Sequence, residues 1–105
     1  MHWTYLLLAI LFEVMGTLSI KQTTITGSYV WGIAVAVFYI ISFTFIGFAI
    51  KKLDIGTAYA IWAGLGTALI VILGWLIFKE SMTTMKVIGI SFIIIGAIML
   101  KLQTT

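Results

Sequence analysis

The chain contains no cysteine, no proline and a single histidine, and each of these absences excludes a class of function. Without cysteine, neither a disulfide framework nor a thiolate metal site can form. The histidine is His2, at the N-terminus, so a two-histidine metal site or a serine–histidine catalytic couple within one chain is excluded. We therefore expect a protein that is not an enzyme and that uses neither a metal nor a cofactor.

Charge is also scarce, at 9% of residues against about a quarter in soluble domains. Hydrophobic residues make up 63% of the chain and the mean hydropathy is +1.26, more than a soluble core of this size can bury. The net charge of +3 comes from scattered lysines and not from a basic patch, so we expect no nucleic-acid partner. No basic residue precedes the first apolar run and no A-x-A-like site follows it, so signal-peptide cleavage is not expected.

The remaining composition indicates a lipid bilayer as the solvent. A membrane-spanning helix needs about 20 predominantly apolar residues, and four such runs fit the chain. We predict one integral membrane domain over 1–105, all-α, with four transmembrane helices in an up-down-up-down bundle. The four predicted helices cover residues 3–21, 29–50, 55–78 and 85–102.

Short polar segments separate these runs and supply the predicted helix ends. The first, residues 21–28, reads KQTTITGS and is predicted to be a loop. Asp54 is predicted to cap the third helix, and Ser81 or Thr83 the fourth, because each offers a side-chain oxygen to the first free main-chain N–H groups.

Lysines in short loops orient membrane proteins, and here the two ends of the helices carry three each. One interpretation is that the lysines specify the orientation in the membrane only weakly and that other signals determine it. The other is a chain that inserts in both directions and pairs with itself as an antiparallel dimer. The lysines are Lys51, Lys52 and Lys101 at one end, and Lys21, Lys79 and Lys86 at the other.

Glu13 lies in the middle of the first apolar run, where a carboxylate costs roughly 2.5–3.5 kcal/mol on insertion scales. Such a residue indicates a functional site that binds a proton or a cation. Ala9, Gly16 and Thr17 share its face of the helix and leave room for a ligand or for a closely packed helix.

Aromatic and hydroxyl side chains on the next two helices fit the same site. Tyr39 and Ser42 are positioned to donate hydrogen bonds to it, although Ser42 could instead bond its own helix backbone. Tyr59, Trp62 and Gly66 share one face of the third helix. Their rings suit an organic cation through the π face, and core packing is the alternative.

Glycines mark two further features. Gly64 and Gly66, one residue apart, weaken the third helix and predict a kink that could serve as a gating hinge. Gly89 and Gly96, with Ile93 between them on the same face and Ala97 continuing it, predict an assembly surface on the fourth helix.

Taken together, these residues resemble the small multidrug resistance family over nearly the whole chain. The resemblance rests on Glu13 followed by MGT and Lys21, on Ser42-Phe43, on AYAIW with GLG, and on the two spaced glycines of the last helix. It implies four-helix subunits paired antiparallel in the bacterial cytoplasmic (inner) membrane. It also implies that the protein exports cations in exchange for protons, with Glu13 binding both.

The resemblance also implies roles for the other residues. Tyr39, Tyr59 and Trp62 match the family's ligand-cage and gating aromatics, and Ser42 matches its glutamate neighbour. Gly64 and Gly66 match the kink in the family's third helix. Gly89 and Gly96 match the family's dimer-forming fourth helix.

Two departures from the family pattern bear on the substrate. The guanidinium-exporting branch usually has tryptophan where this chain has Gly16, and one polyamine-exporting subunit has an extra acid where this chain has Ala63. We therefore expect export of quaternary ammonium or polyaromatic cations by a homodimer. The alternatives are a polyamine or guanidinium-type exporter that pairs with a homologous subunit, a lipid-carrier translocase of the same fold, a cation channel, or a pure assembly protein.

Overall fold

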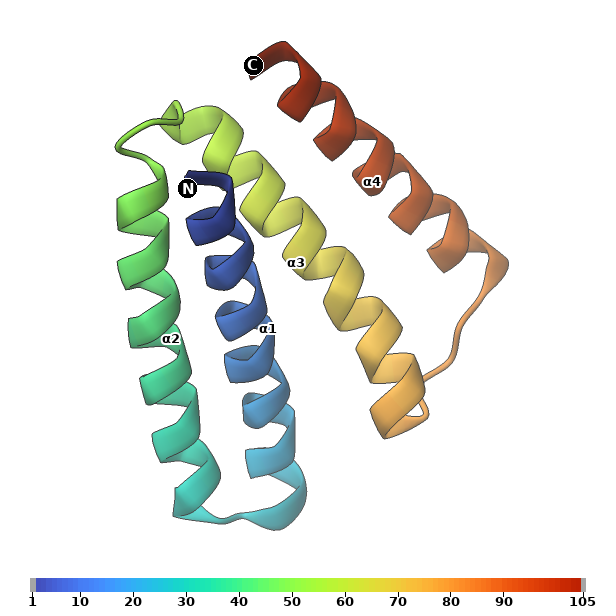
Figure 1. Ribbon diagram of the computed structural model, residues 1–105. Helices are drawn as coiled ribbons and strands as arrows, with labels where there is room; N and C mark the ends of the chain where they lie inside the picture. The colour runs from blue at the N-terminus through green and yellow to red at the C-terminus, as the bar shows by residue number, and fades with distance from the viewer. Residues whose placement is uncertain (1, 105) are drawn as a thin grey trace.

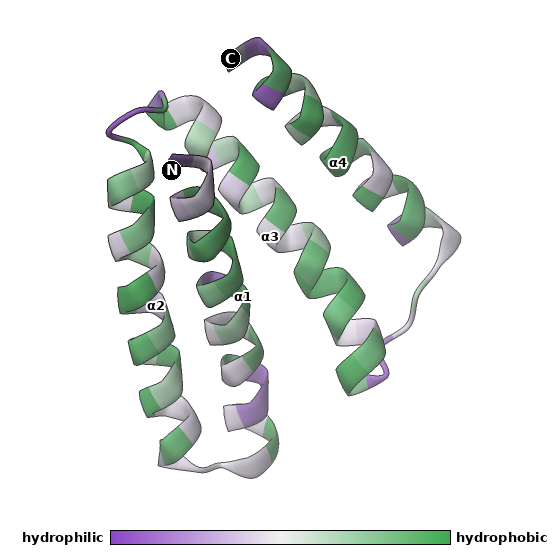
Figure 2. Cartoon of the chain, viewed as in Figure 1, coloured by the Kyte–Doolittle hydropathy of each residue, from purple (hydrophilic) through white to green (hydrophobic). Residues whose placement is uncertain are grey.

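The computed structural model describes residues 2–104, which form four helices and, within that range, no strand (Figure 1). Each helix is long and apolar enough to cross a membrane, which confirms the four predicted spans. Figure 2 shows apolar residues around all four helices and hydrophilic ones mainly at their ends, the pattern of helices solvated by lipid. The helices are α1 (His2–Thr26), α2 (Tyr29–Ala49), α3 (Ile55–Phe78) and α4 (Thr84–Thr104).

Helix α1 continues five residues beyond its predicted end, so the prediction of a loop over 21–28 was wrong. The hydroxyls of Thr23, Thr24 and Thr26 donate to main-chain carbonyls three or four residues earlier, at 2.6–3.0 Å. These bonds stay within the helix and do not compete with it. The helix ends at Gly27, whose φ of 67° lies in the left-handed region that glycine adopts without cost.

The later helix starts follow the predicted caps. Asp54 accepts a hydrogen bond from the main-chain N–H of Thr57 at 3.0 Å, and Thr83 accepts one from that of Lys86 at 3.2 Å. Both caps are confirmed, and of the two candidates for α4 the structure uses Thr83. Ser81 instead accepts from the Lys86 ammonium at 3.4 Å.

The helices lie in a row, in the order α2, α1, α3, α4 (Figure 1). Helix α1 packs against both α2 and α3, and α4 packs against α3. The molecule measures 43 × 34 × 17 Å, and its smallest dimension is less than two helix diameters of about 10–12 Å. The helices alternate in direction as predicted, but a single chain forms an open layer and not a closed bundle.

The buried side chains gather around α1, one of the two inner helices of the row. Leu6, Ile10 and Val14 of α1 form one cluster with Ile61 of α3. On the other side of α1, aromatic rings connect it to α2 with centroids 5.3–6.2 Å apart. Helix α1 is therefore held from both sides, and it is the helix that carries Glu13.

The Asp54 cap predicts a measurable pH dependence. Hydrogen bonds from the Thr57 side chain and main-chain N–H lower the pKa of Asp54. Because the folded pKa is below the unfolded one, the ionised cap stabilises α3 above the unfolded pKa, and this stabilisation is lost as the pH falls through the lowered folded pKa. We expect the Thr57 amide resonance in NMR spectra to titrate with a midpoint below that of a free aspartate. Asp54→Asn should abolish the titration, and a midpoint at or above the free value would contradict the assignment.

Candidate functional site

Glu13 is partly buried in the middle of α1 and is held by a chain of two hydroxyl groups. The Thr17 hydroxyl donates to Glu13 Oε1 at 3.0 Å, and Thr17 Oγ1 lies 2.7 Å from the Tyr39 hydroxyl oxygen. A threonine hydroxyl has only one proton, so Tyr39 donates to Thr17. The result is a directed chain of hydrogen bonds from Tyr39 through Thr17 to Glu13 that fixes the direction of the carboxyl group.

Gly16 explains how Tyr39 reaches this position. A Cβ atom at Gly16 would lie 2.6 Å from two carbons of the Tyr39 ring, closer than atoms can approach. The ring of α2 therefore rests directly on the backbone of α1. The residue that packs on Gly16 is thus the tyrosine that contacts Thr17.

The two glycines at the predicted kink of α3 face different neighbours. A Cβ at Gly66 would lie 3.0 Å from Glu13 Oε2, so the α3 backbone passes beside the carboxylate. A Cβ at Gly64 would lie 3.3 Å from Ile93 of α4. Helix α3 is continuous from Ile55 to Phe78, and the hinge at Gly64 and Gly66 stays a prediction.

A cavity of about 360 Å³ opens between α1 and α3 beside the carboxylate, within the usual size range of ligand sites. Among its lining residues, Glu13 supplies the one carboxylate and Tyr59 and Trp62 supply aromatic rings. Its lining is Glu13, Thr17, Tyr59, Trp62, Ala63, Gly66, Thr67, Ile70 and Val71. A negative charge beside two rings is an arrangement that binds an organic cation.

The aromatic rings continue from this cavity to α2. Trp62 meets Tyr59 and Phe43 edge to face, with centroids 5.6 and 5.9 Å away, and Phe43 lies 6.1 Å from Tyr39. The Trp62 Nε1 group is buried and has no hydrogen-bond partner among the described residues. Phe43, which belongs to the Ser42-Phe43 motif of the family resemblance, thus connects the predicted aromatic residues of α2 and α3.

Comparison with known proteins identifies the family of the chain. A family model described as "Small Multidrug Resistance protein" matches residues 1–93. The chain belongs to the small multidrug resistance family. It is also 41% identical over 102 residues to a protein of Bacillus subtilis (strain 168) named "Uncharacterized membrane protein YvaE", covering 97% of this chain and 86% of that protein.

Family membership makes the chain a multi-pass membrane transporter, and it confirms the resemblance found in the sequence. The cavity beside Glu13 is the place in this family member where a carboxylate, a hydroxyl chain and aromatic rings meet. The individual roles of these residues, and the branch of the family, stay predictions.

In this small multidrug resistance protein, Ser42 makes neither of the two predicted hydrogen bonds. Its hydroxyl donates to the main-chain carbonyl of Ala9 at 2.6 Å, and neither residue is exposed. It therefore bonds neither Glu13 nor its own helix. In an α-helix the carbonyl of residue 9 also accepts the N–H of residue 13, so Ser42 holds the stretch of backbone that carries Glu13.

Four cavity residues were missed in the sequence, although helical spacing could have found all of them, since Val71 also follows Thr67 by four. Ala63 and Thr67 follow Tyr59 at intervals of four, and Ile70 follows Gly66 at the same interval. Their types gave no chemical signal, because alanine, threonine and isoleucine are ordinary in membrane helices. Val71 completes the lining.

The predicted assembly surface on α4 lies partly against α3 and is partly open. Nothing lies within 4 Å of a Cβ built at Gly89 or Gly96, so both positions border open space in the single chain. Ile93 instead packs toward Gly64 of α3, and Ala97 is only 8% exposed. Ile93, Gly96 and Ala97 nevertheless line one cavity, so they share a face of α4, and the assembly role of that face stays a prediction.

The close approach of Gly66 to Glu13 predicts a coupling between the two positions. Gly66→Ala should be less stable than Gly47→Ala by about 1–2 kcal/mol, because added volume in a packed site costs this much. Gly47 is the matched control, since nothing lies within 4 Å of a Cβ there. The free energies of reversible unfolding in mixed detergent micelles give the values. Removing the carboxylate in Glu13→Ala should abolish the penalty, and strictly additive effects would contradict the contact.

The Ser42 bond predicts a second stability effect. Ser42→Ala should lower the free energy of unfolding by about 0.5–1 kcal/mol, the usual range for one hydrogen bond between membrane helices. Thr44→Ala is the control, because the Thr44 hydroxyl bonds Ile40 of its own helix. The same unfolding assay measures both variants. Equal losses would show that the bond to Ala9 contributes nothing specific.

Proposed function

We propose that this small multidrug resistance protein exports organic cations in exchange for protons, and that Glu13 binds both in turn. The observation that supports it most is the cavity in which the Glu13 carboxylate faces the side chains of Tyr59 and Trp62. Quaternary ammonium and polyaromatic cations suit this lining, since they pair with one negative charge and stack on aromatic faces.

Proton and cation exclude each other at a single carboxylate. The ionised form of Glu13 attracts a cation, and the protonated form has no charge to offer. A bound cation therefore releases the proton, and a proton releases the cation. Exchange across the membrane follows if the transporter reorients only when Glu13 is loaded with one or the other.

Tyr39 and Thr17 prepare Glu13 for this role. Their two hydroxyl protons point along one chain toward Glu13 Oε1. Charge-assisted hydrogen bonds of this kind stabilise the ionised carboxylate and fix its direction while a cation is bound. When Glu13 is protonated, the hydroxyl chain loses the charge that aligns it.

The open layer supports an antiparallel homodimer in the bacterial cytoplasmic membrane. Four helices in a row leave one side of the Glu13 cavity uncovered, and a second copy can close it. The equal lysine counts at the two ends suit insertion in both directions. On α4, Gly89 and Gly96 border open space where a partner helix can approach closely. A homologous paired subunit is the alternative partner.

Gly16 supports the multidrug branch. The ring of Tyr39 occupies the space where a tryptophan of the guanidinium-exporting branch would begin. The cavity lining contains one carboxylate, Glu13, which suits a singly charged cation better than a polyamine. The site thus favours large monovalent cations.

The proposal predicts proton release from the purified protein when tetraphenylphosphonium is added in weakly buffered detergent solution. The wild type should release protons in a saturable manner, and Glu13→Gln should release none. Glu80→Gln is the matched control, because Glu80 is about half exposed and pairs with Lys21 at 3.8 Å, outside the cavity. It should behave as the wild type does.

The same assay separates the alternatives. Release triggered only by guanidinium or only by spermidine would replace the multidrug assignment by the corresponding branch. No release with any of the three cations would contradict proton–cation competition at Glu13. Uptake of tetraphenylphosphonium into proteoliposomes with an acidic interior, absent in Glu13→Gln, would establish transport.

A further inference from the structure

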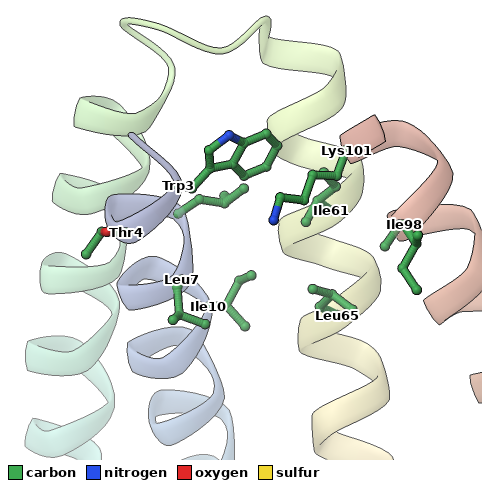
Figure 3. Close-up of a pocket in the computed structure, with 10 residues that line it drawn as sticks. Trp3, Thr4, Leu7, Ile10, Ile61, Leu65, Ile98 and Lys101 are labelled. Atoms are coloured by element: carbon green, nitrogen blue, oxygen red, sulfur yellow. The ribbon is translucent and has the colours of Figure 1, made fainter. Parts of the chain in front are cut away.

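A second cavity lies between α1, α3 and α4, near the ends of α1 and α4 that meet beside the α2–α3 turn (Figures 1 and 3). Its volume is about 360 Å³, similar to that of the Glu13 cavity. Its deep wall is hydrocarbon: Leu6, Ile10 and Ile61 are each less than 5% exposed. We call this cavity the upper crevice, and Lys101 is the one charged residue among its lining.

A cation and an indole ring mark the mouth of the upper crevice. Figure 3 shows Lys101 extending from α4 toward Trp3 of α1, with Ile61 and Leu65 on the neighbouring part of α3. The Lys101 ammonium lies 5.3 Å from the centre of the Trp3 ring. Tryptophan and lysine at a helix end are the residues that sit at the level of lipid headgroups.

The upper crevice opens sideways to the surroundings of the helices. Leu7 of α1 and Ile98 of α4 line it and are 54% and 53% exposed. Because the four helices span a bilayer, this rim meets lipid hydrocarbon and not water. An acyl chain can enter between α1 and α4 and remain in contact with the membrane.

The charge at the mouth selects among amphipathic ligands. Lys101 repels the organic cations that Glu13 attracts, so the upper crevice does not suit the transported substrate. An ammonium beside an apolar groove instead suits a phosphate on an acyl chain, the chemistry of basic lipid sites between membrane helices.

We propose that the upper crevice binds an anionic phospholipid, with an acyl chain between α1, α3 and α4 and its phosphate on Lys101. This site is independent of the proposed transport activity. The bound lipid contacts both α1 and α4. It therefore stabilises the position of α4, an outer helix of the row that the chain itself packs against α3.

Native mass spectrometry of the full-length protein can test the headgroup contact. We would add phosphatidylglycerol or phosphatidylcholine with identical acyl chains and compare the affinities. The wild type should prefer phosphatidylglycerol, and Lys101→Gln should reduce this preference about five-fold, the effect expected for one lysine near an anionic lipid. Lys51→Gln is the matched control, because the Lys51 ammonium lies 5.2 Å from the Phe48 ring at the same end of the helices but outside the crevice lining.

A second variant tests the apolar part. Ala97→Phe fills the upper crevice and should remove one bound phospholipid per protomer, whereas Ala36→Phe on the exposed side of α2 should not. Three results would overturn the proposal. The first is an equal effect of Lys101→Gln and Lys51→Gln on the lipid preference, and the second is an unchanged number of bound lipids in Ala97→Phe. The third is a change in the number of protomers in Ala97→Phe without a change in bound lipid, which would mean that the crevice holds a partner chain.

Discussion

An ionisable carboxyl group in an apolar helix is the constraint on which the rest of the site depends. Glu13 can remain there because Thr17 donates to it and because Gly66 lets the α3 backbone pass beside it. Thr17 is oriented by Tyr39, which in turn needs the bare backbone of Gly16. Small and hydroxyl residues that would be unremarkable in any membrane helix thus form one connected set around a single charge.

The arrangement of helices in a row explains why such a set is built on α1. As an inner helix it is packed from both sides, by the rings and the Ser42 bond of α2 and by the apolar cluster with α3. This packing fixes the backbone that carries Glu13. The faces of the layer remain open, which fits a family whose members act as oligomers in the membrane.

Two cavities of similar size share the α1–α3 pair, and their charges are opposite. One contains Glu13 beside Trp62, and the other has Lys101 beside Trp3 at its mouth. They use adjacent faces of α3, since Ile61 lines one and Trp62 the other. Under the two proposals, the opposite charges of these neighbouring cavities separate a site for cations from a site for lipid phosphate.

The sequence by itself determined the four apolar helices, the Asp54 cap and the shared helix face of Tyr59 and Trp62, because hydropathy, capping and helical spacing act within one segment. Only the tertiary structure decided that Ser42 bonds Ala9 and that Lys21 pairs with Glu80. Such contacts depend on which face of one helix meets another. In a soluble helix the apolar face would indicate this, but a helix in lipid is apolar on every side.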